Sequence, residues 1–183
     1  KFTVEPAAID ESAFNSLDGR KMVLELSRRK AEAVAINHRN AIVIAADTVV
    51  ILGDQVIGKP RNQREAKQML RALSGKPHIV VTSFTAIDTG KNKTLTETVE
   101  TTVYIKPLQR EVINAYARTG EPLGKAGAYA IQGLGSVIVE KIEGDYFNVV
   151  GLPLSKLADS LKLLGINVLQ YQLVPRAKRA ACS

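Results

Sequence analysis

The sequence predicts an α/β fold in which helices flank a mixed sheet. Segments with apolar residues at helical spacing alternate with shorter segments that show the apolar runs or strict alternation of strands. Turn signals rich in Gly, Asp and Pro separate these segments. Hairpins join several of the predicted strands, so the order is not a regular βαβ repeat, and α+β stays open beside α/β.

The first part of the chain predicts a helix followed by strands. Residues 18–38 form the helix, because apolar side chains recur there along one face. The uninterrupted apolar run over residues 41–46 predicts a strand that is buried on both faces and ends at Asp47 and Thr48. A second apolar run follows, and a Gly-Asp turn at residues 53–54 predicts a hairpin.

The middle of the chain predicts a second helix and a long hairpin. Residues 63–73 carry apolar side chains at helical spacing, and Gly75 and Pro77 end that helix. Residues 78–87 and 96–105 both have extended patterns. The second of these alternates apolar and polar residues, which indicates a half-buried antiparallel strand.

The last third predicts two more helices and a strand between them. Pro107 opens a helix that passes Tyr116 and ends at Gly120. After a glycine-rich loop, residues 136–142 have the pattern of a strand. A stripe of leucines over residues 154–164 predicts the final helix.

The length of the chain and its single cysteine bear on domain organisation and cellular location. The chain has 183 residues, and we expect one domain over residues 1–175 followed by a basic tail over residues 176–183. Cys182 is the single cysteine, so no disulfide can form within the chain, which fits the reducing cytoplasm. No apolar run approaches the length of a membrane span and no signal peptide is visible, so we expect no membrane partner.

The charge balance points to an anionic partner. The formal net charge of +7 suits a nucleotide, a nucleic acid or the polyanions of the cell in general. Aromatic residues make up only 5% of the chain, too few for a surface that stacks bases, so nucleic acid is the less favoured partner. His38 and His78 are the only histidines, which excludes a multi-histidine metal site, and we assign neither a catalytic role.

Two short segments have the composition of ligand-binding sites. Asp47 and Thr48 follow the predicted buried strand, and in open α/β sheets the carboxyl ends of strands face the ligand crevice. A turn or a helix cap is the alternative for such an aspartate. Lys59 stands between Gly58 and Pro60, which restrict the backbone and can aim the ammonium at a phosphate. The same three residues also suit an ordinary turn.

A third segment, residues 124–133, is rich in small residues that let a backbone approach a ligand closely. Gln132 can pair with a base edge through its amide, although a tight packing corner explains the small residues equally well. The spacing matches neither a Walker A loop nor G-x-G-x-x-G. Ser27, Arg28 and Arg29 look like a phosphate-binding motif, but they lie inside the first predicted helix on a face expected to be solvated, so we assign them no role.

Six stretches stand in a recognisable order: residues 46–50 (ADTVV), 58–60 (GKP), 70–80 (LRALSGKPHIV), 120–122 (GEP), 125–133 (KAGAYAIQG) and 144–153 (GDYFNVVGLP). Together they resemble the Maf family of nucleotide pyrophosphatases over essentially the whole chain. The resemblance implies the fold shared with inosine-triphosphate pyrophosphatases, with two lobes around a central cleft. It also implies a homodimer and hydrolysis of a nucleoside triphosphate to monophosphate and pyrophosphate with a divalent cation, Mg²⁺ or Mn²⁺.

The resemblance and the chemistry of triphosphates together imply catalytic roles for three residues. Asp47 would bind the metal or orient the attacking water, and Glu11 would be the second carboxylate, since Mg²⁺ and Mn²⁺ prefer oxygen ligands. Lys59 would neutralise the charge that grows on the phosphates in the transition state.

The substrate-binding roles follow from the same resemblance. Thr48 and Gln132 would recognise base and sugar, and Lys125 would contact a phosphate. Ala-Asp-Thr together with Ala-Ile-Gln-Gly resembles the dTTP/UTP branch, which implies a house-cleaning role in nucleotide metabolism. Asp145 and Asn148 would hold the loop that shapes the cleft.

Members of the family also carry a Ser-x-Ser-Pro-Arg-Arg loop that binds the phosphates. The printed sequence begins downstream of that place, at Lys1. If the loop precedes it, the enzyme prediction stands, and if the natural protein lacks the loop, the loss of two arginines should weaken transition-state binding by several kcal/mol. Two alternatives stay open. One is a non-enzymatic regulator of cell division or nucleic-acid-binding module, and the other is the same chemistry with a different base preference, such as 7-methyl-GTP.

Overall fold

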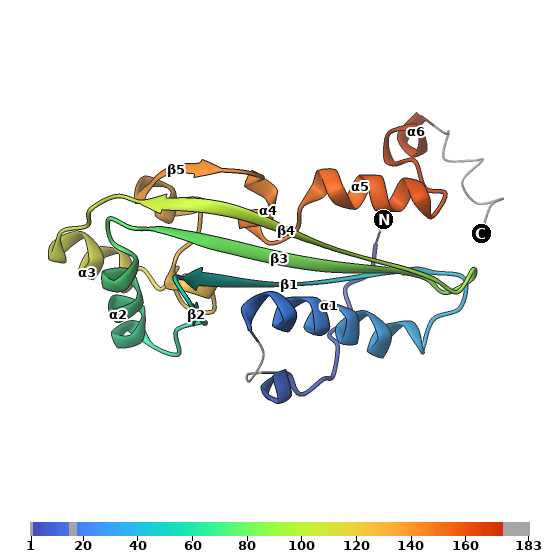
Figure 1. Cartoon of the computed structure of the whole chain (residues 1–183), viewed down its shortest axis with the longest axis horizontal. Helices are drawn as coiled ribbons and strands as arrows, with labels where there is room; N and C mark the ends of the chain where they lie inside the picture. The colour runs from blue at the N-terminus through green and yellow to red at the C-terminus, as the bar shows by residue number, and fades with distance from the viewer. Residues whose placement is uncertain (1, 15–17, 174–183) are drawn as a thin grey trace.

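The computed structural model of the chain describes residues 2–14 and 18–173. Five strands form one sheet in this part: β1 (Ile42–Leu52), β2 (Gln55–Ile57), β3 (Pro77–Asp88), β4 (Lys93–Ile105) and β5 (Val139–Glu143). Their order is β2-β1-β3-β4-β5, and each neighbouring pair is antiparallel. The long strands β1, β3 and β4 form an extended, twisted ribbon (Figure 1). The predicted tail over residues 176–183, with Cys182, lies outside the described residues.

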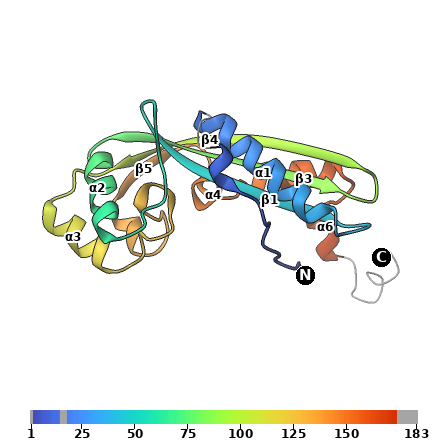
Figure 2. The ribbon, with the colours of Figure 1, turned by 90° about the horizontal axis from the view of Figure 1, so that it is seen from below.

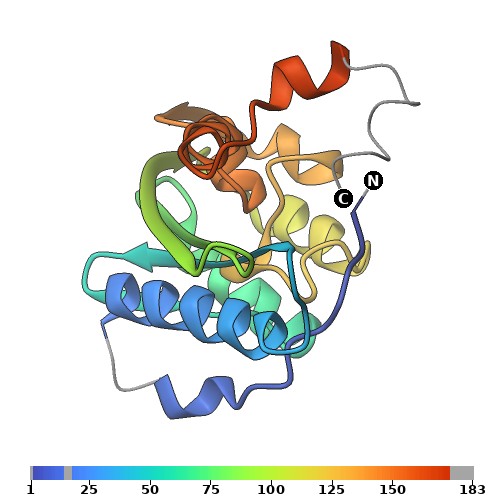
Figure 3. The same ribbon diagram turned by 90° about the vertical axis from the view of Figure 1, so that its right-hand side faces the viewer.

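Helices cover both faces of this sheet: η1 (Glu11–Phe14), α1 (Gly19–Ala35), α2 (Gln63–Leu73), α3 (Arg110–Arg118), η2 (Ala126–Ala128), η3 (Gly133–Val137), α4 (Tyr146–Val150), α5 (Leu154–Leu163) and α6 (Val168–Leu173). The long helix α1 packs on one face against β1 and β3, whereas α4 and α5 lie on the other face (Figures 1 and 3). At one end of the sheet, α2 and α3 pack against each other, with η2 against α2 (Figure 2). This arrangement confirms the predicted α/β class with flanking helices, but the sheet of the described residues is antiparallel throughout and not mixed as predicted.

The apolar core is divided between the two faces of the sheet, since Val50 lies in the larger part while its strand neighbour Val49 lies in a smaller one. The larger part joins α2 and α3 to the strands, and Leu70 and Leu73 of α2 are fully buried there. Burying a leucine side chain contributes roughly 1.5–3 kcal/mol, so these two residues hold α2 firmly on the sheet. Two smaller clusters lie under α1, around Val23 and around Ala31.

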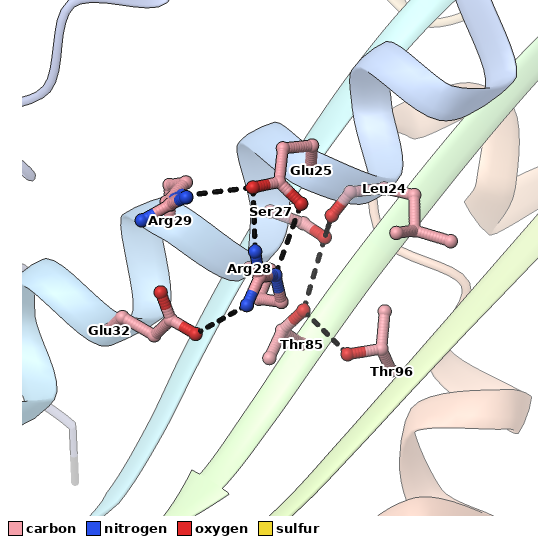
Figure 4. A network of polar contacts seen from close by, with 8 residues as sticks. All are labelled: Leu24, Glu25, Ser27, Arg28, Arg29, Glu32, Thr85 and Thr96. Atoms are coloured by element: carbon pink, nitrogen blue, oxygen red, sulfur yellow. Dashed lines mark hydrogen bonds and ion pairs between the residues drawn. The ribbon is translucent and has the colours of Figure 1, made fainter.

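The first helix corrects the prediction for Ser27. We expected a solvated face, but Ser27 is 0% exposed and its Oγ lies 3.1 Å from Oγ1 of Thr85 on β3 (Figure 4). Arg28 and Arg29 do lie on the outer side, where both pair with the carboxylate of Glu25. A small hydroxyl side chain lets α1 approach β3 closely while the buried oxygen stays hydrogen-bonded.

The structure also corrects the prediction for the strand over residues 41–46. That strand does not end at Asp47 and Thr48, because β1 continues through them to Leu52 with unbroken pairing to β3. Nor is it buried on both faces, since Ile44 is 40% exposed. The rule about carboxyl ends of strands applies to parallel sheets, so the argument that first favoured Asp47 is wrong even though Asp47 borders a cavity.

Candidate functional site

A cavity of about 380 Å³ opens at the free edge of β1, large enough for a small-molecule ligand. Within the described residues, β2 pairs with β1 only from Val50 to Leu52, so the edge at residues 46–48 has no neighbouring strand. Successive side chains of a strand point to opposite faces, so Asp47 faces α1 and Thr48 faces α4. Because both lie at the open edge, both line the cavity.

Lys30 of α1 lies between two carboxylates. Its Nζ is 2.7 Å from Oδ1 of Asp47 and 2.7 Å from Oε1 of Glu11. The side chains of Lys30 and Asp47 are largely buried, with 17% and 11% exposed, whereas that of Glu11 is 50% exposed. One ammonium therefore holds the two carboxylates close together beside the cavity.

These charges shift one another's pKa values. Burial raises the pKa of Asp47, against the opposing effect of the Lys30 ammonium. The hydrogen bond from Lys30 lowers the pKa of Glu11. Burial alone would lower the pKa of Lys30, but the two carboxylates outweigh it and the pKa is raised. Lys30 is therefore a cation throughout the neutral range.

The hydroxyl of Thr48 has a defined direction. Its Oγ1 lies 2.8 Å from Oγ1 of Thr82, and the Thr82 hydroxyl donates its proton to the carbonyl of Asn148 at 2.9 Å. A hydroxyl has one proton, so Thr48 must be the donor in the bond with Thr82. The lone pairs of Thr48 are then left to accept a hydrogen bond from a ligand.

Two loops that line the cavity are tied together. The amide of Gly127 donates to the carbonyl of Gly58 at 3.0 Å, which joins the turn of Lys59 to the glycine-rich segment. Gly127 has φ +73, and a Cβ there would lie 2.9 Å from Val50. Only glycine fits this close approach. Ala128 follows with φ 60, which few residues with a side chain adopt.

A buried pair of side chains, His78 and Tyr129, anchors the glycine-rich segment to β3. Nε2 of His78 lies 2.7 Å from Oη of Tyr129, whose side chain lines the cavity. Burial lowers the pKa of His78 to about 4, so the imidazole is neutral at physiological pH. Nδ1 of His78 has no hydrogen-bond partner among the described residues. His78 is thus a buried neutral side chain.

The structure brings five of the six predicted site residues to one cavity: Asp47, Thr48, Lys59, Lys125 and Gln132. The sixth, Glu11, does not line the cavity, but it forms an ion pair with Lys30, which does. Lys59, Lys125 and Gln132 are exposed, as side chains that meet a ligand from solvent must be. Three lysines and Asp47 around the cavity, with Glu11 behind Lys30, form a site suited to a metal-bound polyphosphate.

The family model described as Maf-like protein matches residues 1–164. The chain belongs to the Maf family.

Relatives within the Maf family carry informative names. A protein of Desulforamulus reducens named dTTP/UTP pyrophosphatase is 44% identical over 168 residues, which cover 92% of this chain and 88% of the relative. A protein of Methanosarcina barkeri with the same name is 42% identical, over 94% and 87% of the two chains. One from a Thermoanaerobacter species, also so named, is 53% identical over 78% and 75%.

The sequence reasoning missed Lys30. It treated the neighbouring Ser27, Arg28 and Arg29 as a misleading motif and passed over the next residue. A signal was present, because Lys30 follows Val23 by seven residues and Leu26 by four, which places it on the apolar stripe of the helix. A lysine on a buried stripe needs an anionic partner, and Asp47 supplies it.

The donor set suits a metal ion that arrives with its ligand. Among the residues that the structure describes, no three His, Cys, Asp or Glu side chains gather as a metal site would require. Asp47 and Glu11 offer two carboxylates, and Mg²⁺ commonly uses one or two carboxylates together with phosphates and water. The residues present therefore fit such an ion. None of the helices over residues 2–14 and 18–173 has the length and apolar content needed to cross a bilayer.

Proposed function

We propose that this Maf-family chain is a nucleoside triphosphate pyrophosphatase that hydrolyses dTTP and UTP to the monophosphate and pyrophosphate. The observation that carries the proposal is the group of Lys30, Asp47 and Glu11 beside a cavity that Lys59 and Lys125 also reach. The names of the relatives support the choice of substrate.

In the proposed reaction, water attacks the α-phosphorus and the bond to the bridging oxygen of pyrophosphate breaks. Asp47 and Glu11 would hold a divalent cation, which would neutralise phosphate oxygens and favour the departure of pyrophosphate. Lys30 keeps both carboxylates in place. Lys59 and Lys125 would stabilise the charge that grows on the phosphate oxygens in the transition state.

Base recognition is assigned to Thr48 and Gln132. Uracil and thymine present an N–H between two carbonyl groups, so the base needs both an acceptor and donors from the protein. Thr48 has lone pairs free to accept, and the Gln132 amide can both donate and accept. This complementarity supports a pyrimidine with a protonated N3 over cytosine.

The experiment measures pyrophosphate release from dTTP, UTP, CTP and 7-methyl-GTP with Mg²⁺ or Mn²⁺. It uses the printed chain and the same chain preceded by the Ser-x-Ser-Pro-Arg-Arg loop of the family. Asp47→Asn should reduce turnover of dTTP and UTP by at least about 100-fold. The matched control is Asp54→Asn, which changes an exposed aspartate in the hairpin turn. No release from any substrate by either chain would falsify the proposal and favour a binding module.

The homodimer and the cytoplasmic location stay predictions. Phe147, Val150 and Leu154 of α4 and α5 are 45%, 42% and 45% exposed, and Val150 also borders the cavity. Such side chains are typical of a surface that another subunit covers. Sedimentation velocity of the whole protein tests the homodimer, and a single species at monomer mass would contradict it.

A further inference from the structure

The carboxylate of Glu121 is the centre of a hydrogen-bond network just outside the cavity. Its Oε1 accepts bonds from Oη of Tyr116 at 2.9 Å and from the amide of Gly135 at 2.8 Å. Its Oε2 accepts a bond from the amide of Leu134 at 3.0 Å. Bonds to an ionised carboxylate are stronger than those between neutral groups, so Glu121 holds this backbone firmly.

Through Tyr116, the network also holds the beginning of the segment over residues 130–135. While the Tyr116 hydroxyl donates to Glu121, it also accepts a bond from the amide of Ala130 at 3.1 Å. The backbone is therefore held at Ala130 on one side and at Gly135 on the other. Between these points lie Ile131 and Gln132, both of which line the cavity.

Glu121 and Tyr116 form a clamp on residues 130–135, and there is little free space between the clamp and this segment. A Cβ at Gly133 would lie 2.6 Å from Oε2 of Glu121, and Gly133 has φ +65. A Cβ at Gly135 would lie 2.2 Å from the carbonyl oxygen of Ala130 and 2.5 Å from Oη of Tyr116. The contact with backbone excludes any residue but glycine at position 135, and at position 133 a side chain would be strained by the positive φ and would displace the Glu121 carboxylate.

The carboxylate stays ionised in this setting. Partial burial alone would raise the pKa of Glu121, but the amides of Gly135 and Leu134, the Tyr116 hydroxyl and the charge of Lys125 outweigh it, and the pKa is lowered. A charged acceptor is therefore present whenever the chain works near neutral pH.

We propose that Glu121 is a positioning residue for nucleobase selection: it fixes Ile131 and Gln132, through the backbone on both sides of them, in the geometry that admits one class of base. This inference rests on the proposed function and adds the group that sets its specificity. Glu121 itself is not among the residues that line the cavity, so it acts through the segment it holds. Under the proposed function the phosphates would bind near Lys30, Asp47 and Lys59, away from the segment that Glu121 holds. Lys125 is the one assigned phosphate contact whose charge acts on Glu121, so we expect only a small effect on the chemical step.

The test compares base selectivity in Glu121→Gln and Tyr116→Phe with the wild type. In Glu121→Gln an amide NH₂ replaces one acceptor oxygen, so the side chain can no longer accept all three hydrogen bonds. We expect KM for dTTP and UTP to rise about tenfold while kcat changes by less than about threefold. Preference for these substrates over CTP and dATP should shrink by about tenfold as well. Tyr116→Phe removes the link to Ala130 and should move the same ratios in the same direction.

The matched control is Glu143→Gln. Glu143 also accepts a hydrogen bond from a tyrosine, Oη of Tyr104 at 2.9 Å, but neither residue lines the cavity. Its selectivity should equal that of the wild type. Melting curves followed by circular dichroism show whether each variant is folded at the assay temperature, and a variant that melts there is assayed at a lower one.

The outcomes separate this proposal from the proposed function. If the wild type turns over dTTP and both variants keep its selectivity and KM, Glu121 has no positioning role. An equal loss of kcat on every substrate would also overturn it, because that result indicates general damage to the fold. If the wild type turns over no nucleotide, the proposed function fails. Calorimetry with dTMP then decides on Glu121, and equal affinity in wild type and variants overturns the proposal.

Discussion

Lys30 and Asp47, 17 residues apart in the chain, form an ion pair of 2.7 Å across the contact between α1 and β1. The pair joins a helix to the middle of a strand, at the point where the edge of β1 is open. It sets the position of the carboxylate to which we assign the central catalytic role. The first prediction concerns this pair.

Replacement of Lys30 by methionine should abolish most of the activity. The change keeps a long side chain but leaves Asp47 and Glu11 facing each other without a cation, and both carboxylates should move apart. We expect pyrophosphate release to fall by at least about 100-fold. The control is Lys21→Met on the same helix, where an exposed lysine lies 4.0 Å from Asp18. Equal activity in both variants would show that the ion pair has no part in the reaction.

Removal of the Ser27 hydroxyl should weaken the attachment of α1 to the sheet. Ser27 is fully buried and its Oγ lies within 3.1 Å of Thr85 and 3.2 Å of Ser83. In Ser27→Ala these hydroxyls lose a shared partner, so the free energy of unfolding should fall by about 1–2 kcal/mol. Urea denaturation measures the loss. Ser155→Ala, at an exposed position of α5, should stay within about 0.5 kcal/mol of the wild type.

The amide of Asn148 should matter more for stability. It is 0% exposed, and its Nδ2 donates to the carbonyl of Val80 at 3.0 Å and to Oγ1 of Thr101 at 2.9 Å. These bonds attach α4 to β3 and β4. Asn148→Ala leaves both acceptors buried without this donor, and we expect a loss of about 2–4 kcal/mol in the free energy of unfolding.

Thermal and urea unfolding measure this loss against Asn37→Ala, a change at an exposed asparagine. A loss below about 1 kcal/mol would contradict the view that the amide bonds hold α4 in place.

His78 should make the stability of the protein depend on pH. Its pKa is about 4 in the folded chain against an ordinary value of 6.5. Between these pH values the unfolded chain binds a proton that the folded chain does not. The free energy of unfolding should therefore fall as pH decreases from 6.5 to 4, by about 3 kcal/mol in total.

The measurement is urea unfolding at several pH values for the wild type and His78→Gln. The variant should lose this part of the pH dependence, while His38→Gln, at an exposed histidine, should keep it. Parallel curves for the wild type and His78→Gln would show that the buried imidazole does not cause the effect.

Much of the fold follows from local sequence patterns. The second helix lies over residues 63–73 as predicted, because its apolar spacing and its cap at Asn62 act locally. The hairpin at residues 53–54 is confirmed for the same reason. By contrast, α4 was not predicted: it is a helix of five residues capped by Asp145, too short for a periodic pattern.

The candidate site likewise contains some residues that local motifs indicate and others that they do not. Asp47, Lys59 and Gln132 could be found because their motifs are local and ordered along the chain. The place of Lys30 on the apolar stripe of α1 was visible in the sequence, but its pairing with Asp47 was not, since that depends on α1 packing against β1, a contact that no short motif encodes. Glu121 was noticed only as part of a motif, because its partners lie 5 to 14 residues away and include backbone amides.

The hydrogen bond between Gly127 and Gly58 bears on how this protein could be re-engineered. It makes the turn of Lys59 and the glycine-rich segment one mechanical unit. A transplanted segment whose backbone did not bring an amide to this point would leave the Gly58 carbonyl, and with it the turn of Lys59, without this support. Exchange of both loops together is the graft that leaves the rest of the cavity undisturbed.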